Sequence, residues 1–143
     1  MGEQNRLHDT HEIHEWKVNR KSSNGMRLEI HTQDAGRFHV IQLRGKVDLY
    51  TSRELKSLLS GHINGSRPGI VIDMAAVTYI DSPGLGVLIQ ANNHIREAHG
   101  RLILAHVPET IRRVFQLTKL EHVFEFEPNV DSAIQSLQSA GQT

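Results

Sequence analysis

Residues 79–87 (YIDSPGLGV) constrain the fold of this chain more than any other stretch, because the hydrophobic pattern changes there. Before them, residues 69–74 form a short β-branched apolar run that is typical of a buried strand. After them, Leu85, Leu88 and Ile95 recur at helical spacing. The pattern therefore predicts a buried strand, a tight connection and an amphipathic helix.

The start of this helix carries a serine with two interpretations. Ser82 is the expected N-cap, because its hydroxyl can accept a hydrogen bond from an amide of the first turn, and Pro83 is the expected first helical residue. A capping serine on a surface turn beside an acidic residue, here Asp81, can also be phosphorylated. Ser82 is therefore either a cap alone or both a cap and a switch.

The rest of the chain alternates between strand and helix patterns. Strand patterns cover residues 26–34, 38–43, 101–106 and 123–126, with a hairpin turn at residues 35–36. Helix starts are expected at a Thr51-x-x-Glu54 capping box, at Pro108, and at Asn129 or Asp131. The alternation predicts an α/β fold, with a mixed, mostly parallel sheet of about five strands and about four helices.

The predicted domain covers residues 26–138, a length that suits one globular unit. Residues 1–25 are polar and finish in a turn-rich segment. We expect them to form an N-terminal extension that is partly ordered at most, and residues 139–143 to form a frayed tail.

Composition excludes several classes of function. Lysine and arginine total 16, as do aspartate and glutamate, so the net charge gives no reason to expect direct contact with nucleic acid. The absence of cysteine excludes disulfides, thiolate metal sites and thiol catalysis. His8, His11 and His14 are spaced three apart, but no fourth ligand is visible, so we expect a solvated extension and neither a metal nor a cofactor.

Hydrophobicity along the chain bears on its location. The first residues lack the apolar core of a signal peptide. No apolar run approaches the roughly 18 residues that a membrane span needs. We therefore expect a soluble cytoplasmic protein without direct membrane insertion.

Two expected loops, residues 44–50 and 75–84, follow strands of the predicted sheet. Function in such sheets gathers at the carboxyl ends of the parallel strands, where the crossover loops emerge. We therefore expect Asp48, Asp81 and Ser82 to share one surface.

Four stretches of the sequence occur in a recognisable order. The sequence VID at residues 71–73 is followed by IDSPGLG at 80–86, LRGKVD precedes them at 43–48, and residues 108–120 form a later helix pattern. In this order and spacing they resemble the STAS domains, in particular the anti-sigma factor antagonists. The resemblance covers about residues 26 to 138 and implies a single STAS-like domain.

The resemblance also implies a function that is not enzymatic. Members of that family bind an anti-sigma factor with serine kinase activity, which phosphorylates the serine after the aspartate and is thereby released, until a serine phosphatase resets the antagonist. The implied phosphoacceptor is Ser82. The implied partner-binding residues are Asp48, Asp81, Ser82, Pro83, Gly84, Leu85 and Gly86. Pro83 stands where many members have serine or threonine, which leaves Ser82 as the one acceptor hydroxyl in the motif.

An enzymatic alternative is a hydrolase with Ser82 as its nucleophile. The Gly-x-Ser-x-Gly elbow needs a glycine where this chain has Ile80, and the sequence places no histidine as the base, although His106 could approach in space. Asp73 lies within the strand pattern and is expected to bond a neighbouring loop instead of pairing with Asp81. We therefore expect no catalytic residues.

A second alternative keeps the fold and changes the role. A STAS domain can serve as a scaffold, either as a subunit of a signalling assembly or in a membrane lipid or anion transport complex. The retained Asp81-Ser82 pair favours the phosphorylation switch.

Overall fold

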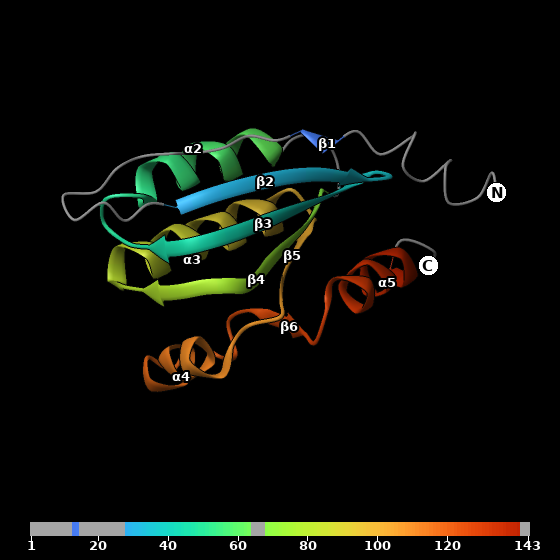
Figure 1. The fold of residues 1–143 in the computed structure, drawn as a ribbon. Coiled ribbons are helices and arrows are strands. Elements are labelled where there is room, and N and C mark those ends of the chain that lie inside the picture. Colours follow the sequence, from blue (N-terminus) through green and yellow to red (C-terminus); the bar gives the residue numbers. More distant parts are fainter. Residues whose placement is uncertain (1–12, 15–27, 64–67, 141–143) are drawn as a thin grey trace.

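The computed structural model describes residues 13–14, 28–63 and 68–140, which form a sheet covered by helices (Figure 1). The six strands, in spatial order, are β1 (Ile13–His14), β2 (Leu28–Ala35), β3 (Phe38–Val47), β4 (Gly69–Ile80), β5 (Arg101–Ala105) and β6 (Glu125–Glu127). Strand β2 is antiparallel to β1 and β3, whereas β3 to β6 are parallel. The predicted mixed, mostly parallel sheet is confirmed, and the two-residue β1 adds one strand to the expected five.

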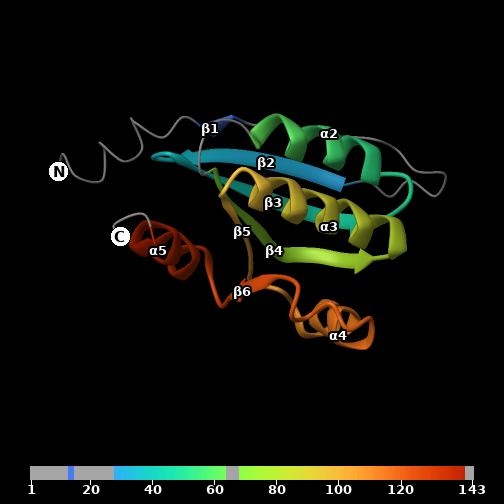
Figure 2. The same ribbon diagram turned by 180° about the vertical axis from the view of Figure 1, so that it is seen from behind.

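Four helices pack on the two faces of this sheet in the described part of the chain. They are α2 (Ser52–His62), α3 (Ser82–Glu97), α4 (Glu109–Leu117) and α5 (Val130–Ala140). Helices α2 and α3 lie side by side on one face, and α5 lies apart from them (Figure 2). Alternate strand side chains supply a large core with α2, α3 and α4, and a smaller core with α5. The predicted four helices are confirmed.

Strands β3 and β4 extend further than their sequence patterns suggest. The expected loops at residues 44–50 and 75–84 are wrong for residues 44–47 and 75–80, because the two strands remain paired up to Val47 and Ile80, and for residues 82–84, which begin α3. The pairing contains register shifts after Gln42 and after Gly45. Such bulges interrupt the alternation of buried and exposed residues from which a strand is recognised. The real connections are therefore short, and both leave the same edge of the sheet.

Thr51 is the N-cap residue of α2 as predicted, but its capping bond and the start of the last strand differ from expectation. The Thr51-x-x-Glu54 capping box is wrong, since the Thr51 side chain makes no capping hydrogen bond and instead donates to the Lys46 carbonyl at 2.9 Å. The last strand begins at Glu125, two residues later than predicted. At α5, Asn129 is the capping residue, because its Oδ1 accepts from the Ser132 amide at 2.7 Å.

The N-terminal histidine pattern is only partly within the described residues. His14 belongs to β1, which pairs with β2 through Ile13 opposite Gln33 and His14 opposite Thr32. His8 and His11 lie outside the described residues. None of the helices described combines the length and the apolar character that a bilayer crossing requires.

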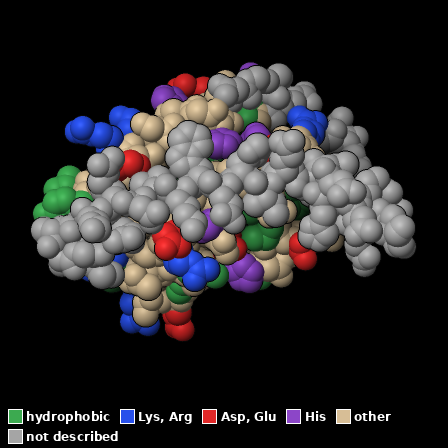
Figure 3. All heavy atoms as spheres, turned by 45° about the horizontal axis from the view of Figure 1, so that its top comes forward, with side chains coloured by type: hydrophobic (Ala, Val, Ile, Leu, Met, Phe, Trp, Pro, Cys, Tyr) green, Lys and Arg blue, Asp and Glu red, His purple; other side chains and the backbone are tan. Residues whose placement is uncertain are grey.

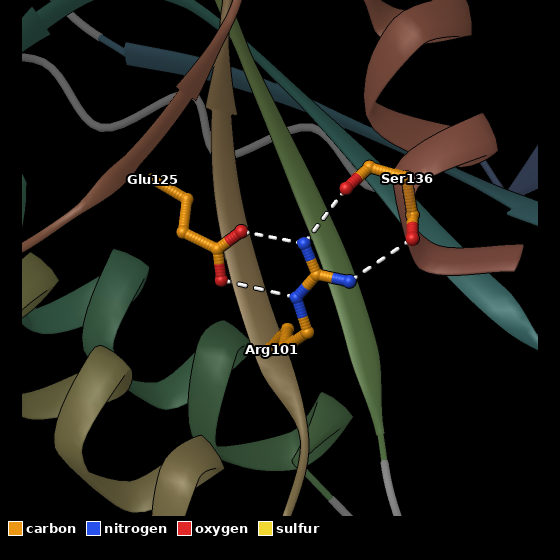
Figure 4. A network of polar contacts seen from close by, with 3 residues as sticks. All are labelled: Arg101, Glu125 and Ser136. Atoms are coloured by element: carbon orange, nitrogen blue, oxygen red, sulfur yellow. Dashed lines mark hydrogen bonds and ion pairs between the residues drawn. The ribbon is translucent and has the colours of Figure 1, made fainter. Parts of the chain in front are cut away.

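Arg101 fastens the far edge of the sheet to α5 (Figure 4). Its Nε and one terminal nitrogen donate to the two carboxylate oxygens of Glu125 at 3.0 and 2.6 Å. The guanidinium also donates to the carbonyl and hydroxyl of Ser136 at 3.0 and 2.7 Å. The hydrogen bonds that Arg101 donates to Glu125 raise the pKa of Arg101 above its ordinary value, which favours the charged guanidinium. Arg101 and Glu125 begin their strands, which places this network at the amino ends of β5 and β6.

Gly84 lets α3 pack directly against the end of β3. A Cβ atom at this position would lie 2.4 Å from the Val47 carbonyl oxygen and 2.9 Å from Val47 Cγ1. Those distances are too short for any other residue, so a glycine is required here. Gly86, two residues later in the same helix, would place its Cβ in open space.

These two glycines make a matched pair of stability predictions. Gly84→Ala should lower the free energy of unfolding by about 1–3 kcal/mol or more, because the Val47 backbone must move. Gly86→Ala should raise it by roughly 0.5–1 kcal/mol, since it gains helix propensity without a clash. Urea denaturation of both variants is the measurement. Equal effects from the two substitutions would contradict the close approach at Gly84.

Candidate functional site

The loop after β3 and the start of α3 meet at the carboxyl ends of β3 and β4. The Asp81 amide donates to the Val47 carbonyl at 3.2 Å. The Leu49 amide donates to Asp81 Oδ2 at 3.1 Å. Segments that are 32 residues apart in sequence are therefore joined at one surface, the place where parallel α/β sheets carry their functional residues.

Asp81, and not Ser82, caps α3. Its backbone is extended (φ −118°, ψ −174°), and its Oδ1 accepts from the Gly84 amide at 3.0 Å. The expectation that Ser82 is the N-cap and Pro83 the first helical residue is wrong by one position. Ser82 is the first residue of the helix and Pro83 the second, where its missing N–H costs no helical hydrogen bond. The Ser82 hydroxyl is thus not needed to cap the helix.

Asp48 lies in the β3–α2 loop and stabilises it through its own hydrogen bonds. Its Oδ1 accepts from the amides of Tyr50 at 2.9 Å and Thr51 at 3.1 Å. Thr51 Oγ1 in turn accepts from the Asp48 amide at 3.0 Å. Three hydrogen bonds over four residues give this loop a defined conformation, and they make Asp48 mainly a structural residue of the surface.

The seven residues predicted for this site differ in accessibility. Ser82 and Pro83 are exposed, and Asp48, Asp81 and Gly86 are half-buried. Gly84 and Leu85 are buried. The structure therefore presents the serine and proline to solvent and uses the two buried residues to seat the helix beneath them.

Sequence reasoning missed three large side chains on the same edge. Leu49 is 61% exposed, Tyr50 59% and Tyr79 46%. Lys46 Nζ lies 5.5 Å from the centre of the Tyr79 ring. Figure 3 shows hydrophobic side chains at the surface where β3 leads toward α2, with charged side chains nearby. The signal available in the sequence was that Leu49 and Tyr50 are apolar residues in a short connection that is otherwise polar.

The chemistry of the surface is that of a hydroxyl beside carboxylates. Among the residues described, no group of three or more His, Asp or Glu side chains is arranged to hold a metal.

Asp73 Oδ1 accepts from the Ala75 amide of its own strand at 3.1 Å, so the expected bond to a neighbouring loop is wrong. His106, the candidate base of the hydrolase alternative, is fixed to β6 by its amide, which donates to the Glu127 carbonyl at 3.3 Å.

The helix start offers few amides to an anion on Ser82. Pro83 has no N–H, and the Gly84 N–H already donates to Asp81. Amides of the first helical turn are the usual donors to a bound phosphate. A phosphate group on Ser82 would therefore gain little from these two positions.

Known proteins that are similar to this chain include anti-sigma factor antagonists. An anti-sigma-B factor antagonist of Listeria monocytogenes is 30% identical over 105 residues, which are 71% of this chain and 90% of that protein. The crystal structure of an anti-sigma factor antagonist from Mycobacterium paratuberculosis has a TM-score of 0.71 at 24% identity and covers 78% of this chain and 95% of that one.

A third relative is the Bacillus cell fate determinant SpoIIAA in its phosphorylated form. Its TM-score is 0.56 at 23% identity, with 78% of this chain and 97% of that chain covered. The two solved structures establish the similarity of the fold. The family model described as the STAS domain matches residues 29–133, most of the chain. This protein belongs to the STAS domain family.

Proposed function

We propose that this protein is an anti-sigma factor antagonist that acts as a phosphorylation-controlled partner switch. With Ser82 unmodified it binds an anti-sigma factor that has serine kinase activity, and with Ser82 phosphorylated it releases that partner. A serine phosphatase restores the binding form. The observation that carries the proposal is the exposed Ser82 hydroxyl, which is not needed as a cap because Asp81 caps α3, on a surface formed by the β3–α2 loop and the start of α3.

The named relatives support this role. The Listeria monocytogenes protein is an anti-sigma-B factor antagonist, and the SpoIIAA structure is of a phosphorylated form. Both are matched over 90% or more of their length, so the likeness concerns whole proteins. In this chain the family motif keeps a single hydroxyl, on Ser82, because Pro83 follows it.

The mechanism follows from the charge that a phosphate adds. A phosphoserine carries roughly −1.5 to −2 charges near neutral pH. On Ser82 that charge lies next to Asp81, and the helix N-terminus partly offsets the repulsion. Neither effect disrupts α3, since the cap bond that the Gly84 amide donates to Asp81 does not involve Ser82. The fold therefore tolerates the modification.

Release of the partner results from the free-energy cost of burying the phosphate charge at the interface, and not from a change in the fold. Reversing a binding equilibrium from 99:1 to 1:99 requires about 5.5 kcal/mol. Burying an unmatched charge against a partner costs roughly 2–5 kcal/mol or more. A phosphate next to the Asp81 carboxylate is thus sufficient to release the partner without a large conformational change.

Phosphorylation is tested with a partner captured from the native cell. Ser82→Ala as bait should retain a kinase-type anti-sigma factor, because it cannot be released by modification. That partner with ATP should add one phosphate to the wild-type chain, located on Ser82 by peptide mass spectrometry, and none to Ser82→Ala. Phosphate on another residue would contradict the proposal. Recovery of a membrane transport complex in its place would support the scaffold alternative.

The charge mechanism is tested with a pair of variants of equal size. Ser82→Asp should weaken binding of the anti-sigma factor by about 10-fold or more, since it places a charge at the interface. Ser82→Asn has nearly the same shape without the charge and should bind within a few-fold of wild type. Calorimetric titration gives the affinities, and thermal melts should show both variants folded. Equal loss by the two variants would indicate a steric effect and overturn the charge mechanism.

A further inference from the structure

The most exposed apolar side chains near Ser82 are two consecutive residues of the β3–α2 loop. Leu49 and Tyr50 are 61% and 59% exposed, although the residues that enclose the loop, Val47 and Thr51, are buried. A single exposed apolar side chain is ordinary, but adjacent ones that form a patch are a common mark of an interaction surface. Tyrosine is also one of the residues that most often dominate binding energies.

The loop that carries this pair is held in a defined conformation. The Asp48 carboxylate accepts from the Tyr50 and Thr51 amides, and the Thr51 hydroxyl bonds both the Lys46 carbonyl and the Asp48 amide. An ordered loop loses less conformational entropy on binding than a mobile one. The exposed pair is therefore preorganised.

The same loop is connected to the phosphoacceptor through one carboxylate. Asp81 Oδ2 accepts from the Leu49 amide, while Asp81 Oδ1 accepts from the Gly84 amide. Ser82 is the next residue after Asp81. The Asp81 side chain thus joins the loop that carries Leu49 and Tyr50 to the start of α3, where Ser82 lies.

We propose that Leu49 and Tyr50 are the hydrophobic anchor by which this protein docks on its anti-sigma factor, and that Asp81 is the positioning residue that holds the anchor beside Ser82. The proposal rests on the proposed function and goes beyond it by naming the residues that bind. Neither Leu49 nor Tyr50 belongs to the residues that the sequence motif marks.

The chemistry of this surface also describes the complementary surface of the partner. An apolar recess must receive the Leu49 and Tyr50 side chains. Basic or hydrogen-bond-donating groups must face the half-buried carboxylates of Asp48 and Asp81 around it. The anti-sigma factor is the fitting occupant because its kinase site must reach Ser82, which is continuous with the anchor. A phosphate on Ser82 then lies at the centre of the contact.

Substitution of the anchor tests the proposal. Leu49→Ser and Tyr50→Ser should each weaken binding of the anti-sigma factor by about 10-fold or more, with unchanged thermal unfolding because both side chains are exposed. Tyr50→Phe, which keeps the ring, should bind within about three-fold of wild type. Leu117→Ser is the second control, since Leu117 is 76% exposed on α4, which follows β5 and not β3 or β4.

Two outcomes separate this inference from the proposed function. If the wild-type chain binds the anti-sigma factor and the two serine variants bind equally well, the anchor is wrong and the proposed function stands. The same holds if Leu117→Ser weakens binding as much as they do. If the wild-type chain binds no anti-sigma factor at all, the proposed function itself fails, and the anchor with it.

Asp81→Asn tests the positioning role. Asparagine is as good an N-cap as aspartate, but its amide nitrogen cannot accept a hydrogen bond, so one of the two bonds is lost. The variant should stay folded, with faster hydrogen exchange at the Leu49 amide and affinity reduced about 10-fold. Faster exchange at Leu49 with wild-type affinity would overturn the role, as would unchanged exchange.

Discussion

The carboxylate of Asp81 is the contact on which the arrangement of this surface depends. Its two oxygens accept from amides of different elements, Gly84 in α3 and Leu49 in the β3–α2 loop. The amide of the same residue donates to the Val47 carbonyl at the end of β3. Asp81 therefore caps α3, holds the β3–α2 loop and adds a backbone hydrogen bond at the end of β3. Hydrogen bonds to a charged acceptor are stronger than neutral ones, which suits a residue with three tasks.

Beneath this contact the sheet and α3 supply a rigid base. Gly84 lies against the Val47 carbonyl so closely that no side chain fits, and Leu85 and Leu88 are buried behind it. The far edge is fastened separately by the Arg101 network with Glu125 and Ser136, at the amino ends of β5 and β6. The site thus lies on packed elements, which hold its exposed residues in place.

The order of the elements could be predicted from the sequence, because the apolar run at residues 69–74 and the helical spacing after Leu85 have different periods. Which residue caps α3 could not be predicted from the sequence, because Asp81 and Ser82 are both good N-cap residues and the choice depends on where β4 ends. Bulges carry β4 on to Ile80, and they follow from pairing with β3 and not from local pattern. The exposure of Leu49 and Tyr50 could not be predicted either, because residue type does not distinguish an apolar side chain in the core from one at a surface.

Which of the two residues, Asp81 or Ser82, caps α3 decides whether a phosphate on Ser82 would act on the fold or on binding. If Ser82 were the cap, its modification would remove the first hydrogen bond of α3 and would act on the fold. Because Asp81 occupies the Gly84 amide and Pro83 has no N–H, a phosphate on Ser82 would find few free amides at the helix start and would remain a hydrated charge beside Asp81. Its free-energy cost appears only when a partner excludes that water. With the cap one residue before the hydroxyl, the phosphorylation that we propose would act on binding and leave the fold intact.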